Sequence, residues 1–184
     1  IKGAGGTEYV TSGGHTEGSL IKGGKQWLTG SAVADRTVFG PNGGYQYVLS
    51  GAVANSTIWE NTTWGFQYVY GGIVNDTVVT SGGWVEAYSG TGNNIQVYES
   101  GRATVMSKGQ LNDTTVYDGG CFDVRSGGIA SNTEVFSGGK QEIFYGGKAY
   151  QTVQGVGGNV NVFVSGGDTD TYVSGTNANG EVFT

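Results

Sequence analysis

Residues 43–59 read GGYQYVLSGAVANSTIW, and this stretch decides the fold. A glycine pair opens it, an alternating run containing Gln46 and Val48 follows, and a second half holds Ala54 and Thr57. Both halves alternate at a period of two, which is typical of β-strands and not of a helix. Glycine tolerates positive φ, so a glycine pair lets the chain turn sharply where each strand ends.

The same pattern returns about every nineteen residues along the whole chain. Gly119, Gly138 and Gly157, for example, are each 19 residues apart. Glycine pairs or degenerate versions of them open successive units at Gly5-Gly6, Gly23-Gly24, Gly43-Gly44, Thr62-Thr63, Gly82-Gly83, Ser100-Gly101, Gly119-Gly120, Gly138-Gly139, Gly157-Gly158 and Thr176-Asn177. A repeat of this length indicates a solenoid, in which each unit buries its apolar face only by stacking on its neighbours.

Stacking the units places like residues in columns that should face inward. One column begins with Glu8, Gln26 and Gln46, takes Gln67 after an insertion, and continues as Val85, Ala103, Phe122, Gln141 and Val160. An apolar column follows it: Val10, Leu28, Val48, Val69, Ala87, Val105, Val124, Ile143 and Val162. A third column carries threonine two residues before an apolar residue, as in Thr37-Phe39, Thr57-Trp59, Thr77-Val79, Thr114-Val116, Thr133-Val135 and Thr171-Val173, with Ile95 replacing threonine once. Hydrogen-bonded ladders along the axis would satisfy the inward glutamines and threonines.

The chain is therefore predicted to be all-β, a right-handed parallel β-helix (solenoid) of about nine to ten coils with nineteen residues per coil. Right-handed crossovers are the strong default for parallel strands. The register is unbroken, so residues 1–184 should form a single domain. The chain starts with Ile1 and both ends break off within a repeat. We expect it to be a fragment of something longer.

Composition narrows the function. The net charge is −6 and the nine Lys and Arg residues are scattered, which excludes a basic nucleic-acid surface. Cys121 is the single cysteine, so it offers neither an internal disulfide nor metal-ligand spacing. His15 lies at an expected turn without a catalytic partner. No metal site and no cofactor are expected, and the Asn-x-Ser/Thr triplets at Asn55, Asn61, Asn75 and Asn112 follow from the repeat.

The repeat G-G-x-Q-x-V-x-S-G-G-x-A-x-x-T-x-V resembles the nineteen-residue repeat of the AIDA-type self-associating autotransporter adhesins of Gram-negative bacteria. Residues 138–152 and 43–57 carry the best matches, and the resemblance covers nearly the whole chain. It implies a passenger domain on the bacterial cell surface, preceded by a signal peptide and followed by an outer-membrane β-barrel, both outside this chain. It also implies O-linked heptose added to Ser and Thr by a cytoplasmic heptosyltransferase. Adhesion to the host cell surface, autoaggregation with passengers on neighbouring cells and biofilm formation are the implied functions.

Serines next to glycine at predicted corners are the candidate glycosylation sites, because a transferase needs a hydroxyl on backbone that it can approach. They are Ser12, Ser50, Ser81, Ser89, Ser100, Ser126, Ser137, Ser165 and Ser174. Serine and glycine also both suit turns, which gives these dipeptides a purely structural explanation. The repeat threonines alternate with valine and should point inward.

Aromatic residues gather at outward positions of the first strand in the N-terminal half. They are Tyr9, Trp27, Tyr45, Tyr47, Tyr68, Tyr70, Trp84 and Tyr88. A face of this kind suits contact with another copy, a glycan or a modifying enzyme, and it equally suits cross-strand stacking that only stabilises the sheet. The corresponding C-terminal positions are Glu86, Thr104, Asp123, Glu142 and Asn161, so the face should change character along the rod.

Two other functions fit a β-helix. A polysaccharide-cleaving enzyme would need acidic and basic residues converging on a cleft, and this chain disperses its fifteen acidic residues and shows no insertion longer than a residue or two. Ice binding would need outward threonine arrays. The leading hypothesis is a non-enzymatic adhesin stalk.

Overall fold

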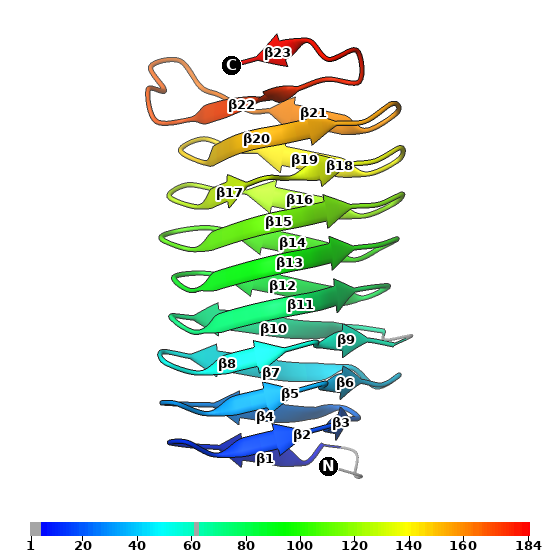
Figure 1. Ribbon diagram of the computed structural model, residues 1–184, viewed down its shortest axis with the longest axis vertical. Helices are drawn as coiled ribbons and strands as arrows, with labels where there is room; N and C mark the ends of the chain where they lie inside the picture. The colour runs from blue at the N-terminus through cyan, green and yellow to red at the C-terminus, as the bar shows by residue number, and fades with distance from the viewer. Residues whose placement is uncertain (1–4, 61–62) are drawn as a thin grey trace.

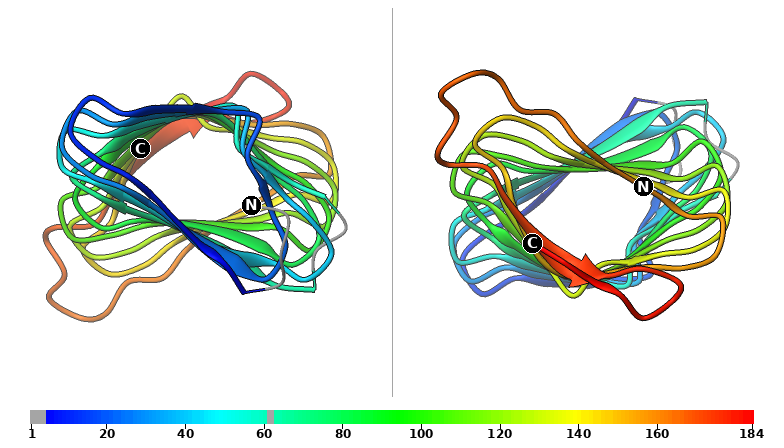
Figure 2. Two further views of the ribbon diagram at one scale, coloured as in Figure 1. Left: turned by 90° about the horizontal axis from the view of Figure 1, so that it is seen from below. Right: turned by 90° about the horizontal axis from the view of Figure 1, so that it is seen from above.

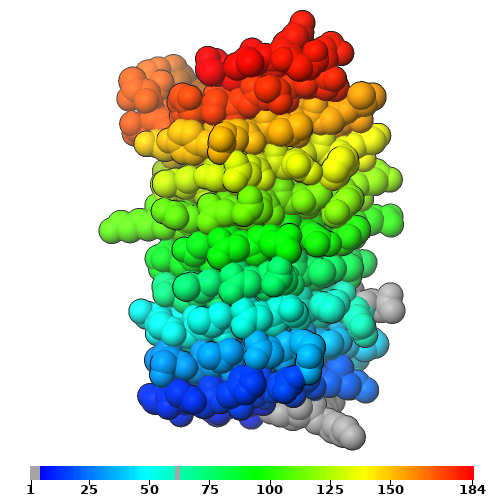
Figure 3. Space-filling model, in the orientation of Figure 1, coloured from blue at the N-terminus to red at the C-terminus, as the bar shows by residue number. Residues whose placement is uncertain are grey.

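The computed structural model describes residues 5–60 and 63–184, which wind into a right-handed parallel β-solenoid (Figure 1). Each coil crosses one sheet, turns, and returns across a second sheet that faces the first. Seen along the axis, the coils superpose into a flattened oval with the two sheets on its long sides (Figure 2). The coils stack directly on one another as layers (Figure 3). The predicted fold class is confirmed.

Among the described residues, nine strands form the first sheet. They are β1 (Thr7–Val10), β4 (Gly24–Leu28), β7 (Gly44–Leu49), β10 (Gly65–Tyr70), β12 (Gly83–Ala87), β14 (Arg102–Val105), β16 (Cys121–Val124), β19 (Lys140–Ile143) and β21 (Asn159–Val162). Neighbouring strands in this order come from successive coils and pair in parallel, which is the pattern that the repeat predicts.

The second sheet has fourteen strands in the described part of the chain. They are β2 (His15–Glu17), β3 (Leu20–Ile21), β5 (Val33–Asp35), β6 (Val38–Phe39), β8 (Val53–Asn55), β9 (Ile58–Trp59), β11 (Ile73–Val79), β13 (Thr91–Val97), β15 (Gln110–Val116), β17 (Ile129–Ser131), β18 (Glu134–Val135), β20 (Lys148–Gln154), β22 (Tyr172–Thr176) and β23 (Val182–Phe183). All pair in parallel except β23, which runs antiparallel to β22.

A bend interrupts the second sheet in each coil from β2 to β20, and here the prediction of strict alternation is wrong. Ala54 and Thr57 both point inward although they are three residues apart, so one residue between them must leave the strand conformation. Ser56 does so, with φ of 54°. The equivalent residues of other coils share this left-handed conformation: Gly18, Arg36, Asp76, Asn94, Asp113, Asn132 and Gln151.

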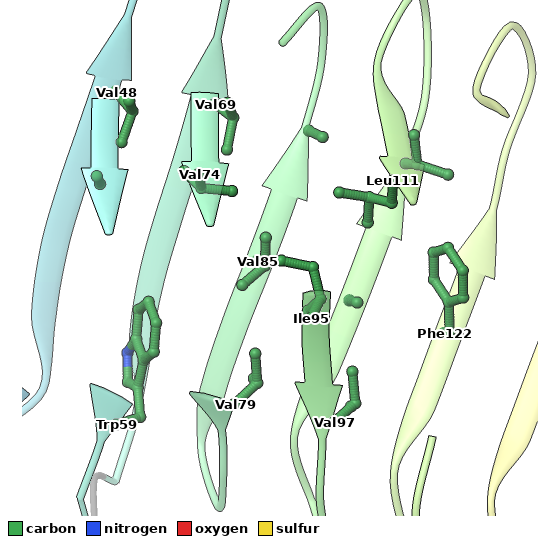
Figure 4. Close-up of a cluster of buried hydrophobic side chains, with 14 of the residues drawn as sticks. Val48, Trp59, Val69, Val74, Val79, Val85, Ile95, Val97, Leu111 and Phe122 are labelled. Atoms are coloured by element: carbon green, nitrogen blue, oxygen red, sulfur yellow. The ribbon is translucent and has the colours of Figure 1, made fainter. Parts of the chain in front are cut away.

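The inward columns are confirmed and form one continuous core. Val10, Leu28, Val48 and the following members of the apolar column through Ile143 are buried, and Figure 4 shows part of this column. Phe39 and Trp59 stack in adjacent coils with ring centroids 4.9 Å apart. Val162 departs from the expectation with 42% of its surface exposed, because no described strand follows β21 in the first sheet.

The inward glutamines form the expected amide ladder. Gln67 Nε2 donates to Gln46 Oε1, and Gln46 Nε2 donates to Gln26 Oε1, each at a distance of 2.6 Å. Glu8 ends the ladder, because its Oε2 accepts from Gln26 Nε2 at 2.7 Å. Each of these glutamines also accepts a hydrogen bond from the threonine of its own coil; Thr57 Oγ1, for example, donates to Gln46 Oε1 at 3.2 Å. The buried amides are thus satisfied without water.

Two expected coil openings need correction. Gly65 pairs with Gly44 and Gly83, so this coil of the first sheet begins at Gly65 and not at Thr62-Thr63, of which Thr62 lies outside the described residues. Thr176 pairs with Val153 inside β22, so Thr176-Asn177 opens no coil.

The predicted Thr171-Val173 core pair is also wrong. Val173 pairs with Ala149, two inward columns away from the expected position opposite Gln154. The cause is a loop of nine residues, 163–171, where the preceding coil uses four, 144–147. It projects from the solenoid (Figure 2), and Asp168 closes it by accepting from the Thr171 backbone N–H at 3.1 Å. The expectation of no long insertion fails here.

Candidate functional site

Most candidate serines lie in one recurring turn at the coil corners. In residues 125–128, Gly128 N–H donates to Arg125 O at 2.8 Å, Ser126 is the second residue, and Gly127 has φ of 73°. A type II turn requires positive φ at its third position, which explains the Ser-Gly order. Five candidates occupy this second position and are exposed: Ser12, Ser50, Ser81, Ser126 and Ser137.

Glycine in the following coil leaves room over several of these hydroxyls. A Cβ added at Gly157 would lie 2.6 Å from Ser137 Oγ, and one at Gly146 would lie 2.8 Å from Ser126 Oγ. Gly30 stands in the same relation to Ser12, at 3.3 Å. The glycine repeat therefore does more than allow turns, because it keeps the serine side chains uncovered by the next layer.

Three other candidates lie at corners in different conformations. Ser100 itself adopts positive φ, 59°, in the third position of its turn. Ser89 lies in the bend between β12 and β13, and Ser165 begins the turn that Asp168 N–H closes at 3.1 Å in the long loop. All three are exposed.

Ser174 is not at a corner, so the corner position predicted for this residue is wrong. It lies within β22, is half-buried, and accepts from the Gln151 backbone N–H at 3.4 Å. The nine-residue loop shifts the register, so a Ser-Gly dipeptide falls in a strand.

Two further serines are exposed at corners but were not among the predicted candidates. Ser31 follows Gly30, and Ser107 precedes Lys108 with φ of 62°. Neither belongs to a Ser-Gly dipeptide. Their position in the nineteen-residue register is the signal that could have found them.

The predicted aromatic residues of the first sheet form a stacked outer face. Trp27 and Tyr47 have ring centroids 3.9 Å apart, and Tyr47 and Tyr68 are 5.4 Å apart. Tyr70 stacks on Tyr88 at 4.9 Å. Tyr9 pairs in register with Trp27 at the N-terminal end and is 70% exposed.

Two aromatic residues belong to this face although the sequence analysis did not select them. Phe66 lies 5.4 Å from Tyr68 and 5.2 Å from Trp84, and Trp64 lies 5.1 Å from Tyr45. The insertion before Gly65 obscured their register. We call the set of Trp27, Tyr45, Tyr47, Trp64, Phe66, Tyr68, Tyr70, Trp84 and Tyr88 the aromatic face.

The electrostatics of the aromatic face follow from partial burial beside a carboxylate. Desolvation, then the charge of Glu86, raises the pKa of Tyr68 to about 12. Desolvation and the hydrogen bond from Tyr88 Oη to Glu86 Oε2, 2.9 Å, raise the pKa of Tyr88. The rings cover one another, which supports the stabilising role, and Tyr70 and Trp84 still expose 39% and 37% of their surfaces. The face can therefore serve both roles.

The expected change of character toward the C-terminal end is confirmed. Tyr68 is followed in register by Glu86, Thr104, Asp123, Glu142 and Asn161. Asp123 is fully covered, and Arg102 and Arg125 contact it at 2.5 and 2.8 Å. Cys121, Asp123 and Glu142 bring possible metal ligands within 4.8 Å of one another. Because arginines pair with Asp123 and Lys140 pairs with Glu142 at 2.5 Å, this group is an ion-pair network.

The regular asparagines form a ladder outside the second sheet. Asn75 Nδ2 donates to Asn55 Oδ1 at 2.8 Å, and Asn55 Nδ2 donates to Asp35 Oδ1 at 2.7 Å. This gives the Asn-x-Ser/Thr triplets a structural explanation; Asn61 lies outside the described residues. His15 begins strand β2 and is not in a turn, and its Nε2 contacts Asp35 Oδ2 at 2.7 Å. The Asn55 hydrogen bond, then that of His15, lowers the pKa of Asp35.

A second aromatic stack lies at the corner that follows the strands of the second sheet, and the sequence did not predict it. Tyr98 and Tyr117 stack with centroids 4.4 Å apart, and Tyr117 and Phe136 are 5.5 Å apart. These rings line an open groove of about 880 Å³ that runs along the rod from Thr80 to Val156. The rings fall just outside the second strand of each coil, where the repeat defines no fixed residue type.

The stacked parallel coils define a parallel β-solenoid. It carries serines at its turns and aromatic ladders on its faces. No protein-family profile and no curated protein sequence matches the chain. It is similar to the crystal structure of a TibA fragment, residues 55–350, hyper-glycosylated in a TibC-catalysed reaction. The TM-score is 0.76 at 30% identity, over 92% of this chain and 67% of that chain. The chain therefore belongs to the family of this TibA fragment. None of the described residues forms a helix long and apolar enough to cross a membrane.

Proposed function

We propose that this chain is a non-enzymatic segment of a surface adhesin of the AIDA type, O-glycosylated with heptose on its corner serines. The observation that carries the proposal is the set of exposed serines in one recurring turn, as at Ser126 and Ser137. The hyper-glycosylated state of the TibA fragment supports it, because that fragment shares this fold. The partner is then a bacterial heptosyltransferase, and the location is the bacterial cell surface.

The modification is a group transfer to the serine hydroxyl. Serine Oγ forms a bond to the anomeric carbon of a nucleoside-diphosphate-activated heptose, and the bond from that carbon to the phosphate oxygen breaks. The nucleoside diphosphate leaves, and the hydroxyl proton passes to a base of the transferase. The chain supplies only the acceptor, so its requirement is an uncovered hydroxyl on accessible backbone.

Intact mass tests the proposal. The chain is produced with and without an autotransporter heptosyltransferase, and we expect a series of heptose-sized mass increments only with the enzyme. A variant with alanine at Ser12, Ser50, Ser81, Ser126 and Ser137 should lose most of the series. An unchanged mass in the presence of active enzyme would contradict the proposal.

We further propose that the aromatic face contributes to self-association and to contact with host cells. Its exposed rings at Tyr70 and Trp84 support this, because repeated weak contacts along a rod add through multivalency. A Tyr47→Ser/Tyr68→Ser variant displayed on cells should aggregate less than the parent. The matched control is Tyr98→Ser/Tyr117→Ser, which removes two stacked rings that lie outside the aromatic face, at the corner after the second sheet. Equal aggregation of the first variant and the parent would contradict this role.

A further inference from the structure

We propose that the groove beside Tyr98, Tyr117 and Phe136 holds the sugar carried by Ser137, so that this sugar packs against its own solenoid. The inference rests on the proposed glycosylation of corner serines. It adds a defined seat for one sugar, with named contacts.

The seat exists because the aromatic stack ends at Phe136. One face of the Phe136 ring covers Tyr117. The other face of the Phe136 ring lies under Gly155 of the next coil. A Cβ at Gly155 would lie 3.9 Å from Phe136 Cδ1, so a side chain there would continue the stack. Glycine leaves the place empty, and Phe136 is 45% exposed. This end of the stack offers an uncovered ring face, whereas Tyr117 is covered by a ring on both sides.

Ser137 lies immediately next to this open face. It follows Phe136 in the turn that Gly139 N–H closes onto Phe136 O at 2.9 Å. Gly157 of the next coil leaves its Oγ uncovered, and Val156, 81% exposed, borders the same groove. The carboxylate of Asp118 lies against Gly138 on the other side of the hydroxyl.

The chemistry of the lining matches a pyranose ring. Such a ring has C–H-rich faces, which pack on an aromatic face and on an apolar side chain such as Val156. Its hydroxyl groups are donors at the rim, and ionised carboxylates accept only. Asp118 and Glu99 supply those acceptors along the groove. A sugar tethered at Ser137 also loses little freedom on settling there, because attachment has already removed most of it.

Ser12 offers a matched comparison. Ser12 occupies the second position of a turn of the same kind, is exposed, and lies below Gly30 of the next coil. Its neighbours before the turn in these two coils are Thr11 and Thr29, which provide no ring face. A sugar at position 12 should extend into solvent.

Chemical attachment tests the seat without any transferase. In a Cys121→Ser background, Ser137→Cys and Ser12→Cys variants are each treated with mannosyl methanethiosulfonate or with its methyl analogue. The thiolate attacks the sulfenyl sulfur, methanesulfinate leaves, and a disulfide links the sugar. We expect the sugar at position 137, relative to the methylthio group, to raise Tm by about 2–4 °C. We also expect its ring-proton resonances to shift upfield relative to the sugar at position 12.

Two further variants make the assignment specific. Phe136→Ala removes the ring, and Gly155→Tyr covers the same face while keeping Phe136, so each should abolish both effects at position 137. Equal Tm changes and equal resonances at positions 137 and 12 would overturn the proposal. So would perturbation of Phe136 by free methyl mannoside at millimolar concentration, which would make the groove a site for separate glycans. Dimerisation that Phe136→Ala abolishes would instead make it a contact between copies.

The two proposals fail in different ways. If a transferase adds no sugar to the chain, the glycosylation proposal fails while the chemically attached sugar still reports on the seat. If a transferase modifies Ser137 but the attached sugar shows neither effect, only the seat is wrong.

Discussion

Ile95 and Val85 together occupy the two core positions that Thr77 and Gln67 hold in the preceding coil, and both point into the core (Figure 4). In that preceding coil Thr77 Oγ1 donates to Gln67 Oε1 at 3.3 Å. Replacing both members by apolar residues leaves no buried polar atom unpaired. In these two coils the pair is therefore either wholly polar or wholly apolar.

Thr114 lacks the glutamine partner that Thr77 has. Its coil has Ala103 in place of the glutamine, and Thr114 Oγ1 is buried without a partner. Thr114→Val should stabilise the chain by about 1 kcal/mol, because it removes an unpaired buried hydroxyl. Urea denaturation measures the change. Thr77→Val is the control and should destabilise, since it leaves Gln67 Oε1 unpaired; stabilisation by both or by neither would contradict the account.

The amide ladder should be sensitive to a single interruption. Gln46→Leu leaves Gln67 Nε2 and Thr57 Oγ1 without their partners in the core. We expect a loss of about 2–4 kcal/mol in the free energy of unfolding, because each unpaired buried group costs about 1–3 kcal/mol. Val85→Leu changes the same column in an apolar coil and should cost less. A smaller loss for Gln46→Leu than for Val85→Leu would show that the ladder contributes little.

The tyrosines near Glu86 predict a pH dependence. The pKa of Tyr68 rises from 10.0 to about 12, so the folded chain holds this proton more tightly than the unfolded chain does. The stability that the neutral phenol contributes is fully present below pH 10 and is lost as the pH rises through about 12. Absorbance of phenolate against pH should show a late-titrating group that Tyr68→Phe removes.

Glu86→Gln gives the control for that titration. It should lower the pKa of Tyr68 and leave it above the usual value, because burial is the first cause and the charge of Glu86 the second. A pKa that does not move in Glu86→Gln would remove Glu86 from the explanation.

Cys121 should react slowly in the folded chain. Burial, and then the charge of Asp123, raises the pKa of its thiol to about 11. Roughly one thiol in a thousand is then ionised at pH 8. Labelling with a disulfide reagent should be at least about tenfold faster in urea than in buffer. Equal rates in the two solvents would contradict the assigned environment.

The sequence was sufficient for the fold because each column has a physical requirement. Positions such as Gln46 and Val48 must face inward in every coil, so their periodicity predicts the coil length and the core. The handedness follows from the general right-handed preference of crossovers between parallel strands. The bend at Ser56 was missed because no single residue type marks its column: Gly, Asp and Asn, which tolerate positive φ, share it with Arg, Ser and Gln.

The candidate site was less predictable for a related reason. Ser126 and Ser137 could be predicted, because a type II turn selects Ser-Gly. Ser174 was misplaced because the length of the loop before it sets its register, and loop length leaves no periodic signal. The groove at Phe136 depends on an absence, the missing side chain of Gly155, in a column where the repeat prescribes nothing.

Site mapping tests the central claim most directly. The chain is modified by an autotransporter heptosyltransferase, and peptide fragmentation that preserves the sugar bond assigns each heptose to a residue. We predict heptose on corner serines, Ser126 and Ser137 among them, and little on Ser174 or on buried Thr57. Heptose distributed equally over Ser174 and the corner serines, or absent from the corners, would contradict the account.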